Sequence, residues 1–399
     1  MKTLFYFELK KIINRKILWV CMFLSLLLIL LTVGVPLLGS YYVDGERIGS
    51  NYEMFQMDAA YQKALVGRPI DEVLLGEMQE AYRKVPLDTR QYSLTEEYQK
   101  YARPYSAIFS YVRQNTGMTG AEILSWAVDE EDLHTKRLEY QEERWKNYLL
   151  SEKEKEFWRG QEAKLENPVL FQYAQGYEIL LDCVYTVGLL AIFMVAVCLA
   201  GVFPEEHVKK TDQLILSSRY GRRNIYRAKF LAGMLVAFLM SLSFALFTFV
   251  MAFVLYGAEG FDAAFWLLYA GSSCPISAGW AVLLAYLMVL LAGVFTGVLT
   301  MMLSEVLCSS VGTLAITIGM IILPMMISIP EEYRLLAQLW SYLPSDFVAV
   351  WSMFSPYTVV ILGKVFQTWQ VVPALYTVLG IAAWFVTEHV FVNYQVSGR

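Results

Sequence analysis

Charged residues are scarce in this sequence. Only 17% of its 399 residues are Asp, Glu, Lys or Arg, whereas 57% are apolar. A soluble domain would carry charge on about 25% of its residues. This composition excludes an ordinary soluble protein and predicts a chain that lies largely in a membrane.

Motifs for nucleotide or metal chemistry are also missing. The chain has no GxxxxGK(S/T) phosphate-binding loop, and Gly363-Lys364 lacks both the upstream glycine and the following hydroxyl. HExxH and GxSxG motifs are absent, and the three histidines and five cysteines show no metal-ligand spacing. We therefore expect no bound cofactor, no enzymatic activity and no nucleic-acid partner. An intramembrane enzyme is the weakest alternative, because the spans offer no paired catalytic groups.

Six hydrophobic runs are each long enough to cross the roughly 30 Å core of a bilayer as a helix, which takes about 20 residues. We expect an all-α polytopic membrane protein. Unbroken runs disfavour a closed barrel, whose strands alternate over about ten residues. The predicted transmembrane helices are 17–39, 177–203, 230–256, 279–303, 306–329 and 371–392.

Basic residues at the N-terminus set the expected orientation. Residues 1–16, predicted as a cytoplasmic amphipathic helix, carry five Lys/Arg against the single Glu8, and such charges favour the cytoplasmic side. Six crossings return the C-terminus to the cytoplasm of a plasma-membrane protein and leave residues 40–176 extracellular. The alternative for the first run is a cleavable signal peptide. Its length disfavours this, because a signal core has about 7–15 residues.

The expected extracellular segment has the pattern of a helical domain. It holds 17 Lys/Arg, 24 Asp/Glu and no cysteine, so no disulfide supports it. Residues 70–85 carry apolar side chains three or four apart, and Ser93 with Glu96 and Thr119 with Glu122 match the capping-box spacing. We expect a charged helical hairpin standing on the membrane, with a specific ligand pocket as the alternative.

Residues 330–370 contain two apolar stretches, 335–343 and 347–363, which are short and broken by Pro344 and Pro356. Short, broken apolar stretches are typical of re-entrant or interfacial segments. We expect an extracellular hairpin here. A full crossing by residues 347–363 is the alternative and would place the C-terminus outside.

Small residues in the later spans predict how those helices pack. Gly293 and Gly297 form a GxxxG pair in the fourth span, and Gly312 and Gly319 lie in the fifth. Such spacing permits close helix approach. We expect this approach within the chain, with a dimer seam as the alternative.

The short loop between the second and third spans, residues 204–229, carries seven Lys/Arg. Positive charge in a short loop places it in the cytoplasm. The apolar residues Leu214, Ile215, Leu216 and Ile225 are spaced to give a helix one apolar face. We interpret the loop as a surface for a partner protein. Anchoring of anionic lipid, worth about 1 kcal/mol per charge, is the alternative.

This loop and the overall layout resemble the permease subunits of type-2 ABC exporters. Acidic residues follow the second span, then come Thr211, the 214–218 segment Leu-Ile-Leu-Ser-Ser and the basic pair Arg222-Arg223, and Lys229 opens the next helix. Phe7-Glu8-Leu9-Lys10-Lys11 is similar to the amphipathic helix before the first span of that family. The large insertion after the first span is found only in some branches.

The resemblance implies a permease without an ATP site. ATP and Mg would be used by a separate cytoplasmic ABC ATPase, and two permeases with two ATPases would form the working unit. The helix around residues 211–218 would sit in a cleft of the ATPase, and charged residues would pair across the contact. The implied coupling residues are Glu205, Glu206, Thr211, Leu214, Ser217, Ser218, Arg222, Arg223 and Lys229.

Three carboxylates inside the spans are candidates for a translocation path, because charge in hydrocarbon tends to face an interior or a partner. Glu178 and Asp182 lie one turn apart at the outer start of the second span, and Glu388 lies near the inner end of the last. The alternative is that they are solvated at the membrane edges. We expect an exporter of a peptide, drug or other amphipathic cargo. The competing function is a sensor or immunity subunit that binds an extracellular peptide and signals without transport.

Overall fold

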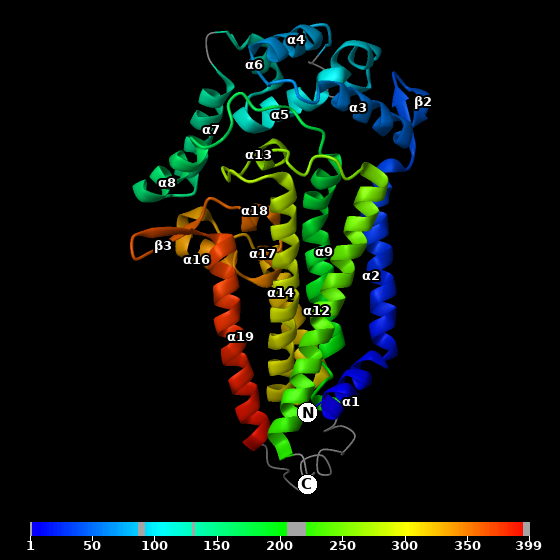
Figure 1. Ribbon diagram of the computed structural model, residues 1–399, viewed down its shortest axis with the longest axis vertical. Helices are drawn as coiled ribbons and strands as arrows, with labels where there is room; N and C mark the ends of the chain where they lie inside the picture. The colour runs from blue at the N-terminus through cyan, green and yellow to red at the C-terminus, as the bar shows by residue number, and fades with distance from the viewer. Residues whose placement is uncertain (1, 87–91, 130–131, 206–220, 394–399) are drawn as a thin grey trace.

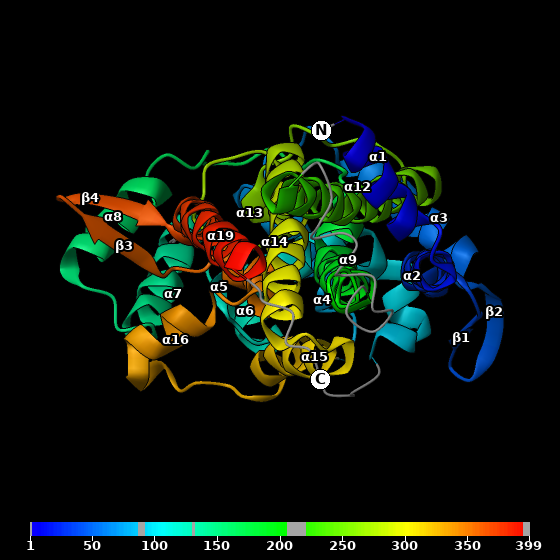
Figure 2. The same ribbon diagram turned by 90° about the horizontal axis from the view of Figure 1, so that it is seen from below.

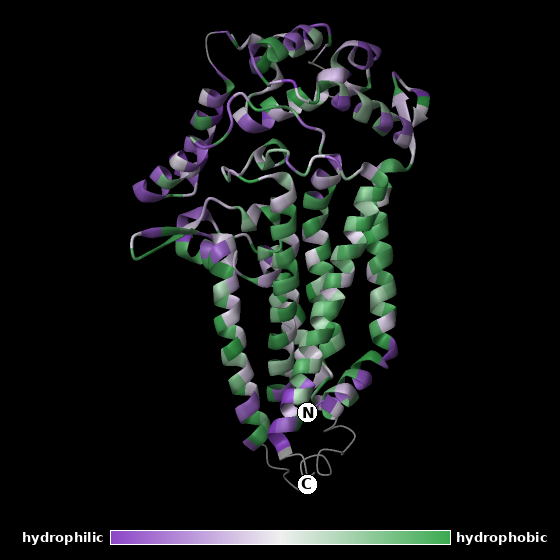
Figure 3. Cartoon of the chain, viewed as in Figure 1, coloured by the Kyte–Doolittle hydropathy of each residue, from purple (hydrophilic) through white to green (hydrophobic). Residues whose placement is uncertain are grey.

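Long apolar helices form the body of the computed structural model, and a smaller, largely helical domain sits on one end of them (Figure 1). The structure describes residues 2–86, 92–129, 132–205 and 221–393. We call residues 40–174 the head domain. We call the opposite end of the bundle, which carries Arg15, Arg222, Arg223 and Arg227, the basic end. Colouring by hydropathy shows the apolar bundle between these two polar ends (Figure 3).

Five helices in the described part of the chain are long and apolar enough to span a membrane. The sixth predicted span is represented by α15, which has 17 residues and so lies at the short limit for crossing. The expected all-α polytopic fold is confirmed. The bundle contains α1 (Lys2–Ile13), α2 (Lys16–Gly34), α9 (Gln175–Leu199), α12 (Gly221–Tyr256), α14 (Ala278–Leu307), α15 (Ser310–Met326) and α19 (Thr368–Asn393).

Helix α12 is longer than the sequence indicated. It begins at Gly221 rather than at residue 230, so the last part of the predicted loop 204–229 is helical. At about 1.5 Å per residue, its 36 residues reach roughly 54 Å, well beyond a hydrocarbon core of about 30 Å. The helix is therefore longer than a single crossing needs, and its first turns at the basic end carry Arg222, Arg223 and Arg227.

Helix α14 packs between α19 on one side and α9 and α12 on the other (Figure 2). A Cβ atom at Gly293 would lie 2.2 Å from Ser241 Oγ, and one at Gly297 would lie 3.0 Å from Ala237 Cβ. Both glycines thus face α12, and the predicted close approach within the chain is confirmed. A Cβ atom at Gly319 would meet nothing within 4 Å, so this glycine takes no part in packing between helices.

The head domain has its own buried core, formed around Leu74, Met78, Ile108 and Val112. The predicted amphipathic helix over 70–85 is present as α4, which buries its Leu and Met side chains. The elements of the head domain are β1 (Ser40–Val43), β2 (Glu46–Ser50), α3 (Asn51–Leu65), α4 (Glu72–Tyr82), η2 (Tyr92–Leu94), η3 (Tyr98–Ala102), η4 (Arg103–Tyr105), α5 (Ser106–Thr116), α6 (Gly120–Ser125), α7 (Leu133–Asn147) and α8 (Glu152–Glu162).

Local predictions for this domain had mixed outcomes. Thr119 and Glu122 form the expected capping box at the start of α6. Ser93 instead lies inside the short η2 helix, where its carbonyl accepts hydrogen bonds, so the prediction of a cap there is wrong. The antiparallel hairpin of β1 and β2 was not predicted, although Asp44-Gly45 is a typical two-residue turn pair and both residues have positive φ.

Residues 330–370 form short elements at the head-domain end, none of them long enough to cross a membrane. The Trp158 indole of α8 donates to the Pro356 carbonyl (2.9 Å), and Thr358 donates to Glu154 (2.7 Å). These buried contacts fasten the segment to α8. The elements are η5 (Glu331–Tyr333), α16 (Arg334–Trp340), α17 (Pro344–Phe347), α18 (Val350–Met353) and the hairpin of β3 (Thr358–Ile361) and β4 (Lys364–Gln367).

Candidate functional site

The chain that leaves α9 at the basic end is fastened by Arg15, which stands between α1 and α2. The Arg15 guanidinium donates to the carbonyls of Cys198 and Gly201 (both 3.2 Å) and forms an ion pair with Glu205. The last carbonyls of a helix have no partner within the helix, so a cation is favourable there. Arg15 therefore fixes the end of α9 and the residues that lead out of it.

Two further side chains hold the same segment from other helices. The Phe203 amide donates to Ser304 Oγ of α14 (3.4 Å), and that hydroxyl donates to the Ala200 carbonyl (2.9 Å). Lys229 of α12 is buried, and its ammonium lies 3.4 Å from the Val202 carbonyl oxygen and 5.2 Å from the Phe203 ring centre. The exit from α9 is thus tied to α2, α12 and α14 at once.

The start of α12 is fastened to the end of α19. Arg222 donates to the Val392 carbonyl (2.7 Å), and the Tyr226 hydroxyl donates to the Trp384 carbonyl (2.7 Å). The Glu388 carboxylate lies 3.7 Å from Arg223 and 3.4 Å from Arg227. Basic residues in the first turns of a helix oppose its dipole, and the nearby carboxylate offsets that repulsion.

The structure brings four of the predicted coupling residues to the basic end: Glu205, Arg222, Arg223 and Lys229. Arg223 is the most open of these, with 72% of its side chain exposed. Glu205 and the start of α12, which flank residues 206–220 in the sequence, both lie at this end. The other predicted coupling residues, Glu206, Thr211, Leu214, Ser217 and Ser218, lie outside the described residues.

The translocation candidates do not gather in one place. Glu178 and Asp182 are exposed residues in the first two turns of α9, beneath the head domain, whereas Glu388 lies with the arginines at the opposite end of the bundle (Figure 1). Glu178 lines a cavity of about 640 Å³ between the head domain and the bundle. Asp58 and Arg103, paired at 2.6 Å, lie in the wall of the same cavity.

Comparison with known proteins identifies the chain. A family model described as ABC-2 family transporter protein matches residues 3–386. The chain belongs to the ABC-2 transporter family. Neither the curated proteins nor the solved structures contain a significant match. This protein is therefore the transmembrane permease subunit of an ABC transporter, a multi-pass membrane protein of a family whose members work with an ABC ATPase subunit.

Sequence reasoning missed several residues that shape the basic end of this ABC-2 permease. The sequence marks Arg15 as an N-terminal basic residue that precedes the first span, but it does not indicate a contact with the end of α9, and it does not single out Ser304 or Tyr226. Their partners lie more than a hundred residues away along the chain. A polar residue at the end of an apolar run was the available signal, but the sequence does not show which distant carbonyl it contacts.

Proposed function

We propose that this permease is the membrane subunit of an ATP-driven exporter that moves a peptide, a drug or another amphipathic cargo out of the cell. The observation that supports the proposal best is the fastening of the chain on both sides of residues 206–220. Glu205 is tied to Arg15, and the start of α12 is tied to α19. Because both flanks are held, a displacement of the segment between them by a bound ATPase would move α2, α9, α12 and α19.

In this proposal the permease binds neither ATP nor Mg, and both are used by an ABC ATPase that docks on residues 204–229. Glu205, Glu206, Arg222 and Arg223 pair across the contact, and the segment 211–218 lies in a cleft of the ATPase. Two permeases and two ATPases form the working unit. The basic residues also attract anionic lipid headgroups, at about 1 kcal/mol each.

The basic end is the cytoplasmic end in this proposal. Positive charge next to short loops favours the cytoplasm, and helix α1 and the end of helix α19 lie on this side (Figure 1). The head domain then lies outside the cell. A thiol-reactive, membrane-impermeant probe on intact cells should label a Lys164→Cys variant and not a Lys10→Cys variant, both in a Cys308→Ser background. The reverse pattern would overturn this orientation.

Glu178 and Asp182 are proposed to line the outer part of the path. They lie one turn apart at the start of α9, and spacing of three or four residues places side chains on one face of a helix. We assign Glu388 to the proposed ATPase contact at the basic end instead, because its carboxylate is beside Arg223 and Arg227. In this proposal cargo meets Glu178 and Asp182 near the exit.

Transport in inside-out vesicles tests the exporter assignment. Cargo uptake should require ATP and should stop when the catalytic glutamate of the partner ATPase is replaced by Gln. The competing function, a sensor or immunity subunit, is suggested by the separate core of the head domain. A sensor would keep its response to an extracellular peptide with the disabled ATPase, and that result would contradict the exporter assignment.

A further inference from the structure

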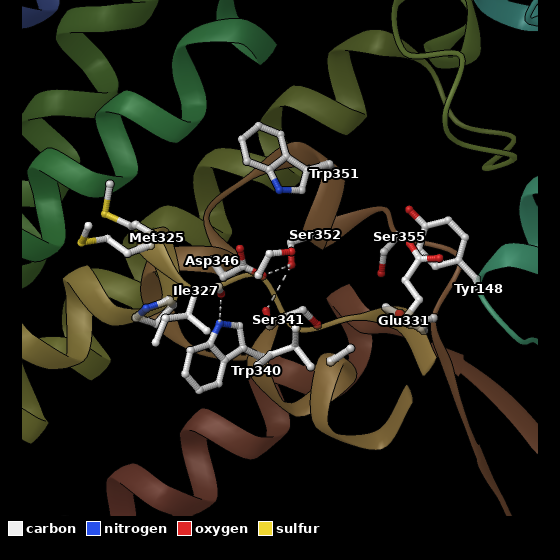
Figure 4. Close-up of a pocket in the computed structure, with 16 residues that line it drawn as sticks. Tyr148, Met325, Ile327, Glu331, Trp340, Ser341, Asp346, Trp351, Ser352 and Ser355 are labelled. Carbon is white, nitrogen blue, oxygen red and sulfur yellow. Dashed lines mark hydrogen bonds between the residues drawn. The ribbon is translucent and has the colours of Figure 1, made fainter. Parts of the chain in front are cut away.

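A pocket of about 350 Å³ lies at the head-domain end of the bundle (Figure 4). Its walls come from the end of α15, from η5 and α16 to α18, and from Tyr148 just after α7. The carboxylates of Asp346 and Glu331 lie in it, and none of the described residues that line it is Lys, Arg or His. The pocket therefore carries negative charge without an internal counter-ion.

Asp346 is the deeper of the two carboxylates. It is half-buried, and the Ser352 hydroxyl lies 3.2 Å from its Oδ2 atom. In the described part of the chain no cation forms an ion pair with it. Arg334 of the neighbouring α16 is engaged elsewhere, by Glu154 and by the Leu149 carbonyl at 2.7 Å. Burial raises the pKa of Asp346, and the Ser352 hydrogen bond only partly opposes that rise.

Four aromatic side chains, Tyr148, Trp340, Trp351 and Tyr357, line the same pocket. The Trp340 indole is oriented by a hydrogen bond to the Ile327 carbonyl (3.0 Å), and Tyr148 meets Tyr357 edge to face, with ring centres 5.2 Å apart. Trp351 is 55% exposed at the rim. Indole and phenol rings attract cations through their faces, by about 0.5–2 kcal/mol depending on desolvation. Rings and carboxylates together favour an apolar molecule that carries positive charge.

The pocket adjoins the proposed path. Trp351 of α18 packs against Tyr185 of α9, with ring centres 5.0 Å apart. Asp182 precedes Tyr185 by three residues, and Glu178 lies one turn earlier, so all three belong to one side of α9. Through Trp351, the pocket therefore adjoins the face of α9 that carries Glu178 and Asp182.

We propose that this pocket binds an organic cation, an ammonium group on an aromatic or aliphatic body, with Asp346 as the counter-ion and Trp340 and Trp351 as ring contacts. The inference rests on the proposed exporter function and narrows its cargo to positively charged amphipathic molecules. Specificity comes from the charge of the ligand together with its apolar body. A neutral molecule of the same shape should bind poorly, because it would leave the carboxylate unpaired.

Equilibrium binding of tritiated benzyltrimethylammonium to the full-length protein in lipid nanodiscs, without ATP, tests the proposal. We expect saturable binding that excess neopentylbenzene, the uncharged carbon analogue, does not displace. Asp346→Asn should weaken binding by about tenfold or more, as expected for loss of a partly buried charge partner. Glu332→Gln is the matched control, because this exposed carboxylate does not line the pocket.

Trp351→Leu provides a second variant at an exposed position and should weaken binding by about threefold, the loss of one cation–ring contact. Non-saturable binding, equal binding by Asp346→Asn, or equal competition by neopentylbenzene would overturn the pocket assignment. Such a failure is separable from failure of the exporter assignment, because recovery of an ABC ATPase and ATP-dependent transport of other cargo do not depend on this pocket.

Discussion

At the scale of single residues, the buried Arg137 forms an ion pair within the head domain and also joins that domain to the bundle. Arg137 of α7 and Glu162 of α8 are both 1% exposed and lie 3.0 Å apart. Arg137 also donates to the carbonyls of Ala270 and Ser272 (3.2 and 3.0 Å), in the connection between α12 and α14. A buried charge is tolerated only when its hydrogen bonds are satisfied, and here the partners come from both parts of the molecule.

Replacing Arg137 should therefore be costly. Arg137→Met keeps the length of the side chain but leaves Glu162 buried without its cation, which should destabilise the fold by about 3–5 kcal/mol. Arg159→Met removes one partner of an exposed pair with Glu142 and should cost at most about 1 kcal/mol. The midpoint of thermal unfolding in detergent, measured for both variants, should be lower for Arg137→Met than for Arg159→Met. Equal midpoints would show that Arg137 does not anchor the head domain.

Glu154 makes a contact whose strength depends on pH. Burial raises the pKa of its carboxyl, but hydrogen bonds from Thr358, Arg334 and Ser151 outweigh that effect, so the pKa is lowered. A carboxylate with a lowered pKa stabilises the folded state above its unfolded pKa of about 4.3 and loses that contribution as pH falls through the folded pKa. The attachment of residues 330–370 to α8 should thus weaken only in acid.

The difference between wild type and Glu154→Gln isolates this contribution. Wild type should unfold at a higher temperature above about pH 5, and the two midpoints should converge as pH falls below about 4. Other acidic groups titrate equally in both proteins, so they cancel in the difference. A gap that stays constant down to pH 3 would contradict the assigned role of the ionised carboxylate.

At the scale of elements, sequence periodicity predicted the helices and caps that depend on neighbouring residues. It missed the features that depend on contacts between distant parts of the chain. The six apolar runs, the amphipathic helix α4 and the cap at Thr119 follow from local pattern. The start of α12 at Gly221 does not follow from local pattern, because Glu388 and Val392 of α19 stabilise its basic first turns. The pocket around Asp346 also brings Tyr148 to the consecutive elements α15, α16 and α17, which lie far from it along the chain.

Close packing of α14 against its neighbours gives a test at this scale. A Cβ atom at Gly297 would lie within 3.0–3.2 Å of Ala237, Leu199 and Val195. Gly297→Val should force α9 and α12 away from α14 and lower the free energy of unfolding by about 1–3 kcal/mol. Gly319→Val, in α15, adds the same side chain to open space and should change stability by less than about 0.5 kcal/mol. Equal unfolding midpoints for the two variants would show that the close approach is unimportant.

At the scale of the whole molecule, the two polar ends carry different features. The basic end fastens the chain around residues 206–220 and is the proposed site of the ATPase. The opposite end carries the head domain, the cavity beside Glu178 and the pocket around Asp346. The long helices α9, α12 and α19 connect the two ends (Figure 1).

The most direct test of this account is affinity purification of the tagged permease in mild detergent, followed by mass spectrometry of the proteins that co-purify with it. We predict an ABC ATPase in near-equal amount, lost with Arg223→Glu at the basic end and retained with Arg159→Glu in the head domain. Both variants should insert in the membrane as wild type does. Absence of an ABC ATPase from the wild-type preparation, or its full recovery with Arg223→Glu, would contradict the proposed coupling site.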